Sequence, residues 1–176
     1  MKHTHITPWF LLFLSLFFSL TACGIPSASA DYLAWLDSPF TASGTAVIDG
    51  ISYPVTLTGS TEAFTVQTAT ENGLSLTFAA ASPGILFTAD GASVTLPEDS
   101  GGIPALFRLF ALSRADLTEV ASDRAGDTPL VLTQFQSEAG AITVTLRASD
   151  LLPTRIEASQ NGVTLSLTLD SFTQSP

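Results

Sequence analysis

The chain has 176 residues, of which 45% are hydrophobic and 12% are charged, and its formal net charge is −10 at pH 7. A chain of this length forms one domain of ordinary size with a real core. Its acidic balance excludes nucleic acid as a partner and excludes electrostatic attachment to anionic lipid, because both would repel it. The single cysteine excludes an internal disulfide.

The first twenty-two residues have the composition of an export signal. Lys2 supplies a short positive start, and the run from Trp9 to Leu20 is apolar apart from two serines. This run is shorter than the roughly 20 residues that a membrane-spanning helix needs. A short apolar run after a positive start is typical of a secretory signal that is later removed.

The end of this run, Leu20-Thr21-Ala22-Cys23, resembles the lipobox of bacterial lipoproteins, in which an aliphatic and two small residues precede a cysteine. The resemblance implies cleavage before Cys23 and a lipid on its sulfur, the most nucleophilic side chain available for alkylation. The expected domains are a signal peptide (1–22), a lipidated tether (23–30) and one β domain (31–176). The expected location is the outer face of a bacterial membrane, where the lipid on Cys23 is the anchor. The alternative is a non-lipidated signal that happens to contain a cysteine.

Residues 31–37 place Tyr32, Trp35 and Leu36 at helical spacing. This spacing predicts a short leading helix, which Pro39 ends. We expect Trp35 to be a packing residue rather than a ligand contact.

From residue 40 onward, apolar and polar residues alternate with the period of half-buried strands. Turn signals recur about every ten residues, which predicts an antiparallel meander of about ten strands. Pro54 lies inside one run and predicts an edge position or a bulge there. The runs include 51–58, 64–67, 74–78, 131–135, 142–147 and 163–170, and the turn signals include Asp49-Gly50, Asn72-Gly73, Pro83-Gly84, Asp90-Gly91 and Asn161-Gly162.

Residues 103–112 (IPALFRLFAL) predict a second helix, in which only Arg108 is charged. A helix that is apolar nearly all round is usually buried. It either plugs the core or forms a lid over a cavity, with Phe107 and Phe110 touching a ligand. The polar and acidic residues 113–127 predict a loop.

This order of elements resembles the LolA/LolB-like fold of bacterial lipoproteins. The local match is Leu152-Pro153-Thr154-Arg155-Ile156-Glu157, followed by a hairpin at Asn161-Gly162. The resemblance covers most of residues 31–172. It implies a mainly β fold, in which a curved antiparallel meander sheet (a half barrel) carries one short leading helix and one apolar helix over the concave face. It also implies an apolar cavity for the acyl chains of lipids or lipoproteins. The sequence is similar as well to small lipoproteins of gut-type Firmicutes, a likeness that implies no activity.

Residues 23–176 contain no histidine and no lysine. Their absence excludes a Ser-His-Asp triad, imidazole metal ligands and a Schiff base, so we expect no enzyme activity, no cofactor and no metal. Carboxylates are the remaining candidates. Glu98 and Asp99 are candidates for glycoside hydrolysis, and Asp123 and Asp127 for weak Ca²⁺ binding, although a solvated loop is the simpler interpretation of each pair.

The predicted apolar helix is too narrow to cover all the predicted strands. A helix about 10–12 Å wide covers only two or three strands at a spacing of about 4.8 Å. The rest of the concave face is either sealed by packing or left as an apolar groove that binds a lipid or acyl chain. The alternative function is a surface interaction or structural module with a closed core. The expected groove residues are Leu57, Phe64, Phe78, Leu106, Phe107, Phe110, Val144 and Leu167.

Overall fold

The computed structural model describes residues 30–60, 63–97, 100–137, 140–160 and 163–175, and these contain eleven strands and three short 3₁₀ helices. The helices are η1 (Ala34–Leu36), η2 (Ile103–Phe110) and η3 (Arg114–Asp116). The strands are β1 (Phe40–Ile48), β2 (Ile51–Gly59), β3 (Phe64–Ala69), β4 (Ser75–Ala80), β5 (Ile85–Ala89), β6 (Ala92–Leu96), β7 (Leu117–Ala125), β8 (Thr128–Ser137), β9 (Gly140–Arg147), β10 (Pro153–Gln160) and β11 (Val163–Gln174).

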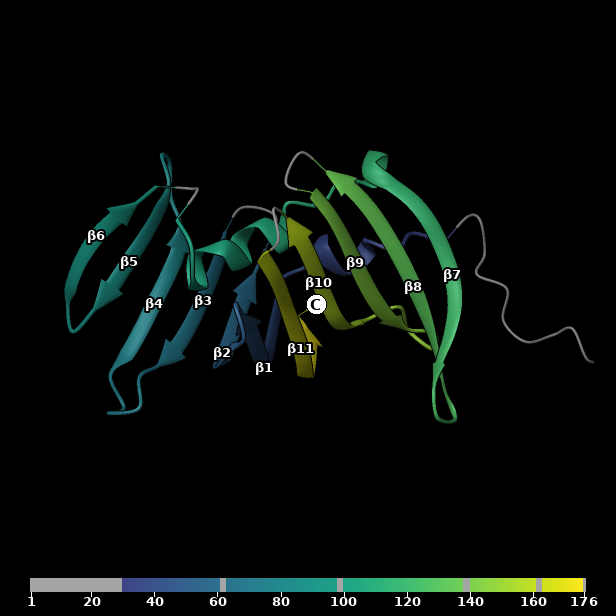
Figure 1. The fold of residues 1–176 in the computed structure, drawn as a ribbon, viewed down its shortest axis with the longest axis horizontal. Coiled ribbons are helices and arrows are strands. Elements are labelled where there is room, and N and C mark those ends of the chain that lie inside the picture. Colours follow the sequence, from purple (N-terminus) through teal and green to yellow (C-terminus); the bar gives the residue numbers. More distant parts are fainter. Residues whose placement is uncertain (1–29, 61–62, 98–99, 138–139, 161–162, 176) are drawn as a thin grey trace, which may run out of the picture.

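All these strands belong to one antiparallel sheet, in the order β6-β5-β4-β3-β2-β1-β11-β10-β9-β8-β7. β1 to β6 form one meander and β7 to β11 form a second, and the two meet where β1 pairs with β11. The sheet is curved and does not close, so β6 and β7 lie at its opposite edges (Figure 1). The predicted mainly β fold with a curved antiparallel meander sheet is confirmed, with eleven strands in place of about ten.

The chain between β6 and β7 connects the two edges of the sheet and has to cross one of its faces. In Figure 1, η2 lies across the hollow of the sheet, and it contacts β4 and β10. A 3₁₀ helix has three residues per turn, so residues three apart share a face. Ile103, Leu106 and Leu109 have this spacing, and all three are buried. The segment that crosses the sheet is therefore apolar because it packs on the buried face.

The sheet face turned toward η2, here called the concave face, is apolar. In β1 burial alternates residue by residue, with Ala42, Ala46 and Ile48 buried and Thr41 and Thr45 exposed. Residues paired across antiparallel strands share a face, so this alternation continues from strand to strand. Further buried residues are Val55, Leu57, Val66, Phe78, Val131, Phe135, Ile142, Val144, Leu146, Ile156, Leu165 and Leu167.

Two local predictions are wrong. Residues 113–127 are not only a loop, because they contain η3 and the edge strand β7, most of whose residues are exposed and so lack apolar alternation. Pro54 lies at neither an edge nor a bulge, because β2 runs between β1 and β3 without a register shift. Pro54 pairs with Thr45 of β1, but its carbonyl accepts a hydrogen bond from Thr68 Oγ1 and so faces β3. The missing N–H faces the same side, where the β2–β3 ladder begins only at Val55 and Thr68, so no ladder hydrogen bond requires it.

Both predicted helices are present but shorter than the sequence suggests. The leading helix spans only η1 within residues 31–37, and the second ends at Phe110 rather than at residue 112. Within the described part of the chain, neither these nor any other helix has the length and apolar character needed to cross a membrane.

Candidate functional site on the concave face

Most of the predicted groove residues fill the interior of the domain. Leu57, Leu106, Val144 and Leu167 are each 0% exposed, and Phe78 is 6% exposed. The structure thus gathers these side chains on the concave face and on η2, as expected of a common site. Because solvent does not reach them, they form packed core under η2 rather than the wall of an open groove.

The other three predicted residues form the centre of an aromatic cluster. The ring of Phe64 in β3 lies 4.2 Å from that of Phe110 and 5.0 Å from that of Phe107, measured between ring centroids. Trp35 and Phe40 each lie 6.2 Å from Phe110. Aromatic pairs at such distances contribute roughly 0.5–1.5 kcal/mol each beyond the area they bury. These contacts hold η2 against the sheet and favour the plug interpretation over a lid.

One row of apolar residues on the concave face leads from this core to the β6 edge. The strand register places Leu57, Val66, Phe78, Phe87 and Val94 opposite one another on the successive strands β2 to β6. Leu57 and Val66 are 0% exposed, whereas Val94 is 52% exposed. Phe87 lies between these extremes, and its ring is 4.9 Å from that of Phe78. Along this row the concave face is therefore sealed near η2 and becomes exposed from Phe87 to Val94.

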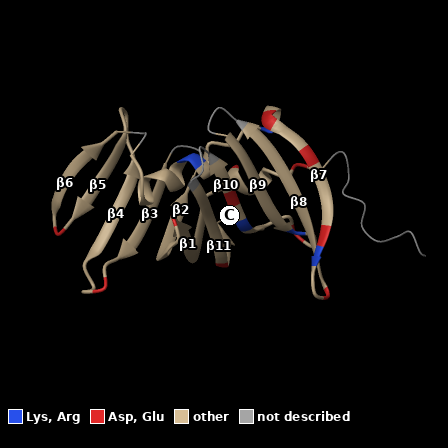
Figure 2. Ribbon diagram, viewed as in Figure 1, with Lys and Arg blue, Asp and Glu red and all other residues tan. Residues whose placement is uncertain are grey.

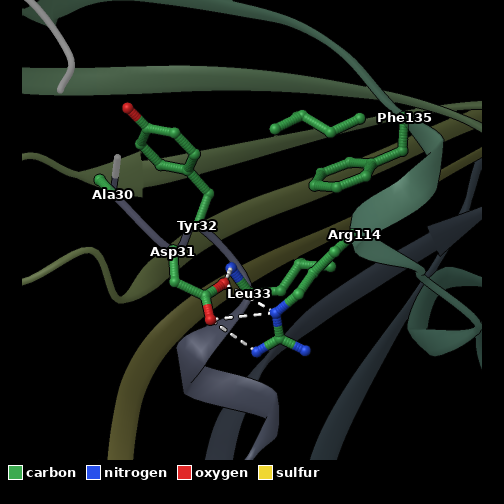
Figure 3. A pocket seen from close by; sticks show the side chains of 7 residues that line it. Ala30, Asp31, Tyr32, Leu33, Arg114 and Phe135 are labelled. Atoms are coloured by element: carbon green, nitrogen blue, oxygen red, sulfur yellow. Dashed lines mark hydrogen bonds and ion pairs between the residues drawn. The ribbon is translucent and has the colours of Figure 1, made fainter. Parts of the chain in front are cut away.

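A pocket of about 250 Å³ lies on the other half of the sheet, beside residues 30–37, here called the N-terminal segment. Tyr32 and Leu33 of this segment are buried, and burial raises the pKa of the Tyr32 hydroxyl. In Figure 3 the rings of Tyr32 and Phe135 lie on one side of the pocket, and the Asp31–Arg114 ion pair lies on the other. The lining residues are Ala30, Asp31, Tyr32, Leu33, Arg114, Leu117 and Phe135.

Arg114 of η3 holds the N-terminal segment in place. Its Nε donates to both carboxylate oxygens of Asp31, at 3.1 and 3.0 Å, and its Nη2 donates to Oδ2 of Asp31 at 2.7 Å. The same Nη2 also pairs with Asp37. Hydrogen bonding to the Arg114 guanidinium lowers the pKa of Asp31, and the two carboxylates raise the pKa of Arg114. All three side chains are about half exposed, so the arrangement is a surface ion-pair network.

The carboxylates in the described part of the chain all belong to residues that are not buried. The buried polar side chains there are three threonines, and no cluster of three His, Cys, Asp or Glu side chains could hold a metal ion. Asp123 in β7 and Asp127 in the following turn are both exposed. Glu98, Asp99 and Cys23, which the sequence singled out, lie outside the described residues.

Comparison with known proteins places the chain in no family. No protein-family model matches it, and no curated protein matches it. A solved structure of PNGF-II in the C2 space group is similar at a TM-score of 0.33 and 10% identity. The match covers 79% of this chain and 28% of the other, so this chain spans less than a third of that protein's length. A likeness this weak indicates no shared function.

Proposed function

We propose that this protein is an exported lipoprotein, anchored to the outer face of a bacterial membrane by lipid on Cys23, whose LolA/LolB-like domain binds a hydrophobic ligand such as a lipid or acyl chain. The observation that carries the proposal is the graded exposure of the concave row, from 0% at Leu57 to 52% at Val94. Single exposed apolar residues are ordinary on protein surfaces, whereas contiguous apolar surface marks binding sites. An acyl chain laid along this row gains about 0.8 kcal/mol for each buried methylene.

The proposed ligand surface is displaced from the one that the sequence suggests. The side chains beneath η2 are packed against each other, so the ligand contacts Phe87 and Val94 at the open end of the row instead. A lipid on Cys23 and a tether of residues 23–30 keep this surface close to membrane lipid, which raises the effective concentration of the ligand. The acidic surface adds no electrostatic attraction to the membrane, so anchoring depends on the lipid.

A closed interaction or structural module is the second candidate. The aromatic cluster at the centre of the domain favours it, because these rings fill the space beneath η2. Neither candidate is an enzyme. The lack of buried carboxylates in the described residues supports that part of the proposal.

Native mass spectrometry of the purified full-length protein, followed by lipid extraction, tests the proposal. Ligand carriage predicts lipid in addition to the covalently attached anchor, and less of it in a Phe87→Gln variant. Leu86→Gln is the matched control, because Leu86 is 37% exposed on the same strand and its side chain points to the opposite face. A wild-type protein without extra lipid, or equal loss from both variants, would favour the closed module.

A further inference from the structure

The outer side of β6 is an uncharged sheet edge. β6 reads ASVTL and is last in the strand order, so no strand among the described residues pairs with its outer side. Residues 92–95 are exposed, and Val94 is the most apolar of them. The free N–H and C=O groups of such an edge can pair with a strand of another chain. Natural proteins usually prevent this pairing with charged side chains, proline or a bulge. β6 has none of these devices, and its pairing with β5 shows no register shift.

The opposite edge of the sheet is protected in the usual way. β7 carries Glu119, Asp123 and Arg124, and Figure 2 shows charges gathered along β7 and η3. Strands β3 to β6 contain no charged residue, and the described charges near them lie in turns, at Glu71 and Asp90, while Glu62, Glu98 and Asp99 lie outside the described residues. Because the chain is strongly acidic, two copies repel each other over most of their surfaces. Residues 92–96 of β6 carry no charge, so they add nothing to this repulsion.

We propose that β6 pairs with β6 of a second copy of this chain, antiparallel and around a two-fold axis at Val94. A two-fold interface brings the same patch of both copies together, so the patch must be complementary to itself. The axis places Val94 opposite Val94 of the second copy, Ser93 opposite Thr95, and Ala92 opposite Leu96. This inference rests on the unpaired edge of the sheet and not on the presence of a ligand, although Val94 belongs to both proposed surfaces.

The β5–β6 hairpin determines which backbone groups of β6 are available. Asp90 and Gly91 form its two-residue turn, and both have positive φ, 47° and 78°, as a type I′ turn requires. Ala89 and Ala92 flank this turn and pair with each other. In a hairpin of this type the flanking residues form a hydrogen-bonded pair, and hydrogen-bonded and non-hydrogen-bonded pairs then alternate along the strands. Val94 thus directs its N–H and C=O toward β5.

The residues between these positions direct their backbone groups to the free edge. Ser93 and Thr95 therefore lie opposite each other across the axis with their N–H and C=O groups oriented to form hydrogen bonds. The side chains match as well, because Val94 meets its counterpart on the concave face while Ser93 and Thr95 meet on the other face. Such pairs stabilise a sheet, and among residues 92–96 no like charges oppose each other. Backbone and side chains thus favour the same register.

Disulfide trapping in cells that express the full chain tests this pairing. A non-hydrogen-bonded antiparallel pair brings opposing side chains closest together, so Val94→Cys is well placed to form a bond across the axis. Under mild oxidation we expect this variant to shift from monomer to a covalent dimer of twice the mass. Ile51→Cys, at a position that is 58% exposed but away from the β6 edge, is the matched control, and the wild type shows any link through Cys23. Equal dimer from Ile51→Cys, or a link only to a protein of another mass, would overturn the proposal.

A charge-reversal pair tests the same axis without a disulfide. Val94→Lys should abolish co-purification of two differently tagged copies, because two lysines then face each other at the axis. Val94→Glu should do the same for the same reason. When the two variants are expressed together, we expect co-purification to return, which also shows that both are folded. Copies of Val94→Lys that still co-purify like wild type, or a mixed pair that accumulates normally without associating, would contradict the proposed interface.

Discussion

Arg114 and Asp31 lie 83 positions apart in the sequence, and three hydrogen bonds of 2.7 to 3.1 Å join their side chains. Arg114 belongs to η3, near the end of the segment that crosses from β6 to β7. Asp31 begins the N-terminal segment, whose Tyr32 and Leu33 are buried in the same core as Phe135. The ion pair therefore connects the N-terminal segment to the end of the segment between β6 and β7. It lies beside the pocket that Tyr32 and Phe135 line.

Replacing Asp31 with Asn should make the stability of the protein less dependent on pH. The pKa of Asp31 lies below its ordinary value of 3.8 because of its hydrogen bonds to Arg114. A carboxylate whose pKa is lower in the folded state contributes stability that is fully present above the unfolded value and is lost as pH falls through the folded value. The wild type should therefore exceed Asp31→Asn in free energy of unfolding by a constant amount near neutral pH. That difference should shrink below about pH 4.

Urea titrations at a series of pH values measure this difference. Because the ion pair is exposed, about 1 M salt should also reduce the difference at neutral pH. A difference that grows on acidification would contradict the assigned direction of the pKa shift.

Adding one methyl group at Gly44 should weaken the joint between the two halves of the sheet. A Cβ there would lie 2.0 Å from the carbonyl oxygen of Thr168 and 3.0 Å from Cα of Leu169, both backbone atoms of β11. The β1–β11 register shifts between Ser43 and Gly44, so this close approach belongs to an irregularity such as a β-bulge. We expect Gly44→Ala to lower the free energy of unfolding by about 1–3 kcal/mol or more, as overpacking does.

Gly101→Ala is the control for this substitution, because nothing lies within 4 Å of a Cβ added at Gly101. Its effect should stay within about 0.5 kcal/mol, as for other surface substitutions. Equal midpoints of urea unfolding for the two variants would mean that the β1–β11 joint adapts to the methyl group.

The alternation of apolar and polar residues predicted strands that have one buried face. It did not predict β7, which has no buried face. Leu165 and Leu167 of β11 are buried and Ser166 between them is not, so the period of two is visible in the sequence. β7 lies at an edge, most of its side chains are exposed, and Glu119 and Asp123 give it the composition of a loop. The alternation of apolar and polar residues arises because one face of a strand is buried. An edge strand that is exposed on both faces lacks this alternation, so the sequence does not predict it.

The candidate site was only partly predictable, for a related reason. The residue pattern identified the apolar face, so the predicted groove residues do lie on it or on η2. Which part of that face is covered depends on where η2 and the N-terminal segment lie, and these are long-range contacts that periodicity does not encode. The pocket between Tyr32 and Phe135 was missed for this reason, since its walls come from residues 30–33 and from Arg114, Leu117 and Phe135, which are far apart in the sequence.

Cys23→Ala should abolish lipid attachment, because the lipobox resemblance puts the lipid on this sulfur. Metabolic labelling with a fatty-acid analogue should mark the wild type and leave the variant unmarked. The variant should also be lost from the membrane fraction, because an acidic protein is not attracted electrostatically to anionic lipid. A Cys23→Ala protein that stays labelled and membrane-bound would refute lipidation at this residue. Cys23→Ser is a second variant that keeps the size of the side chain and removes only the sulfur.

Substitution of Leu106 distinguishes a plug from a lid. Leu106 is 0% exposed, so if η2 is a permanent part of the core, Leu106→Ala should lower the free energy of unfolding by about 2–5 kcal/mol. If η2 instead detaches readily from the sheet, its contacts contribute little and the cost should be well below that range. Leu74→Ala is the control, because Leu74 is 42% exposed and its truncation should cost little. Hydrogen exchange adds an independent measurement, since amides of residues 103–110 should exchange as slowly as those of the central strands if η2 is a plug.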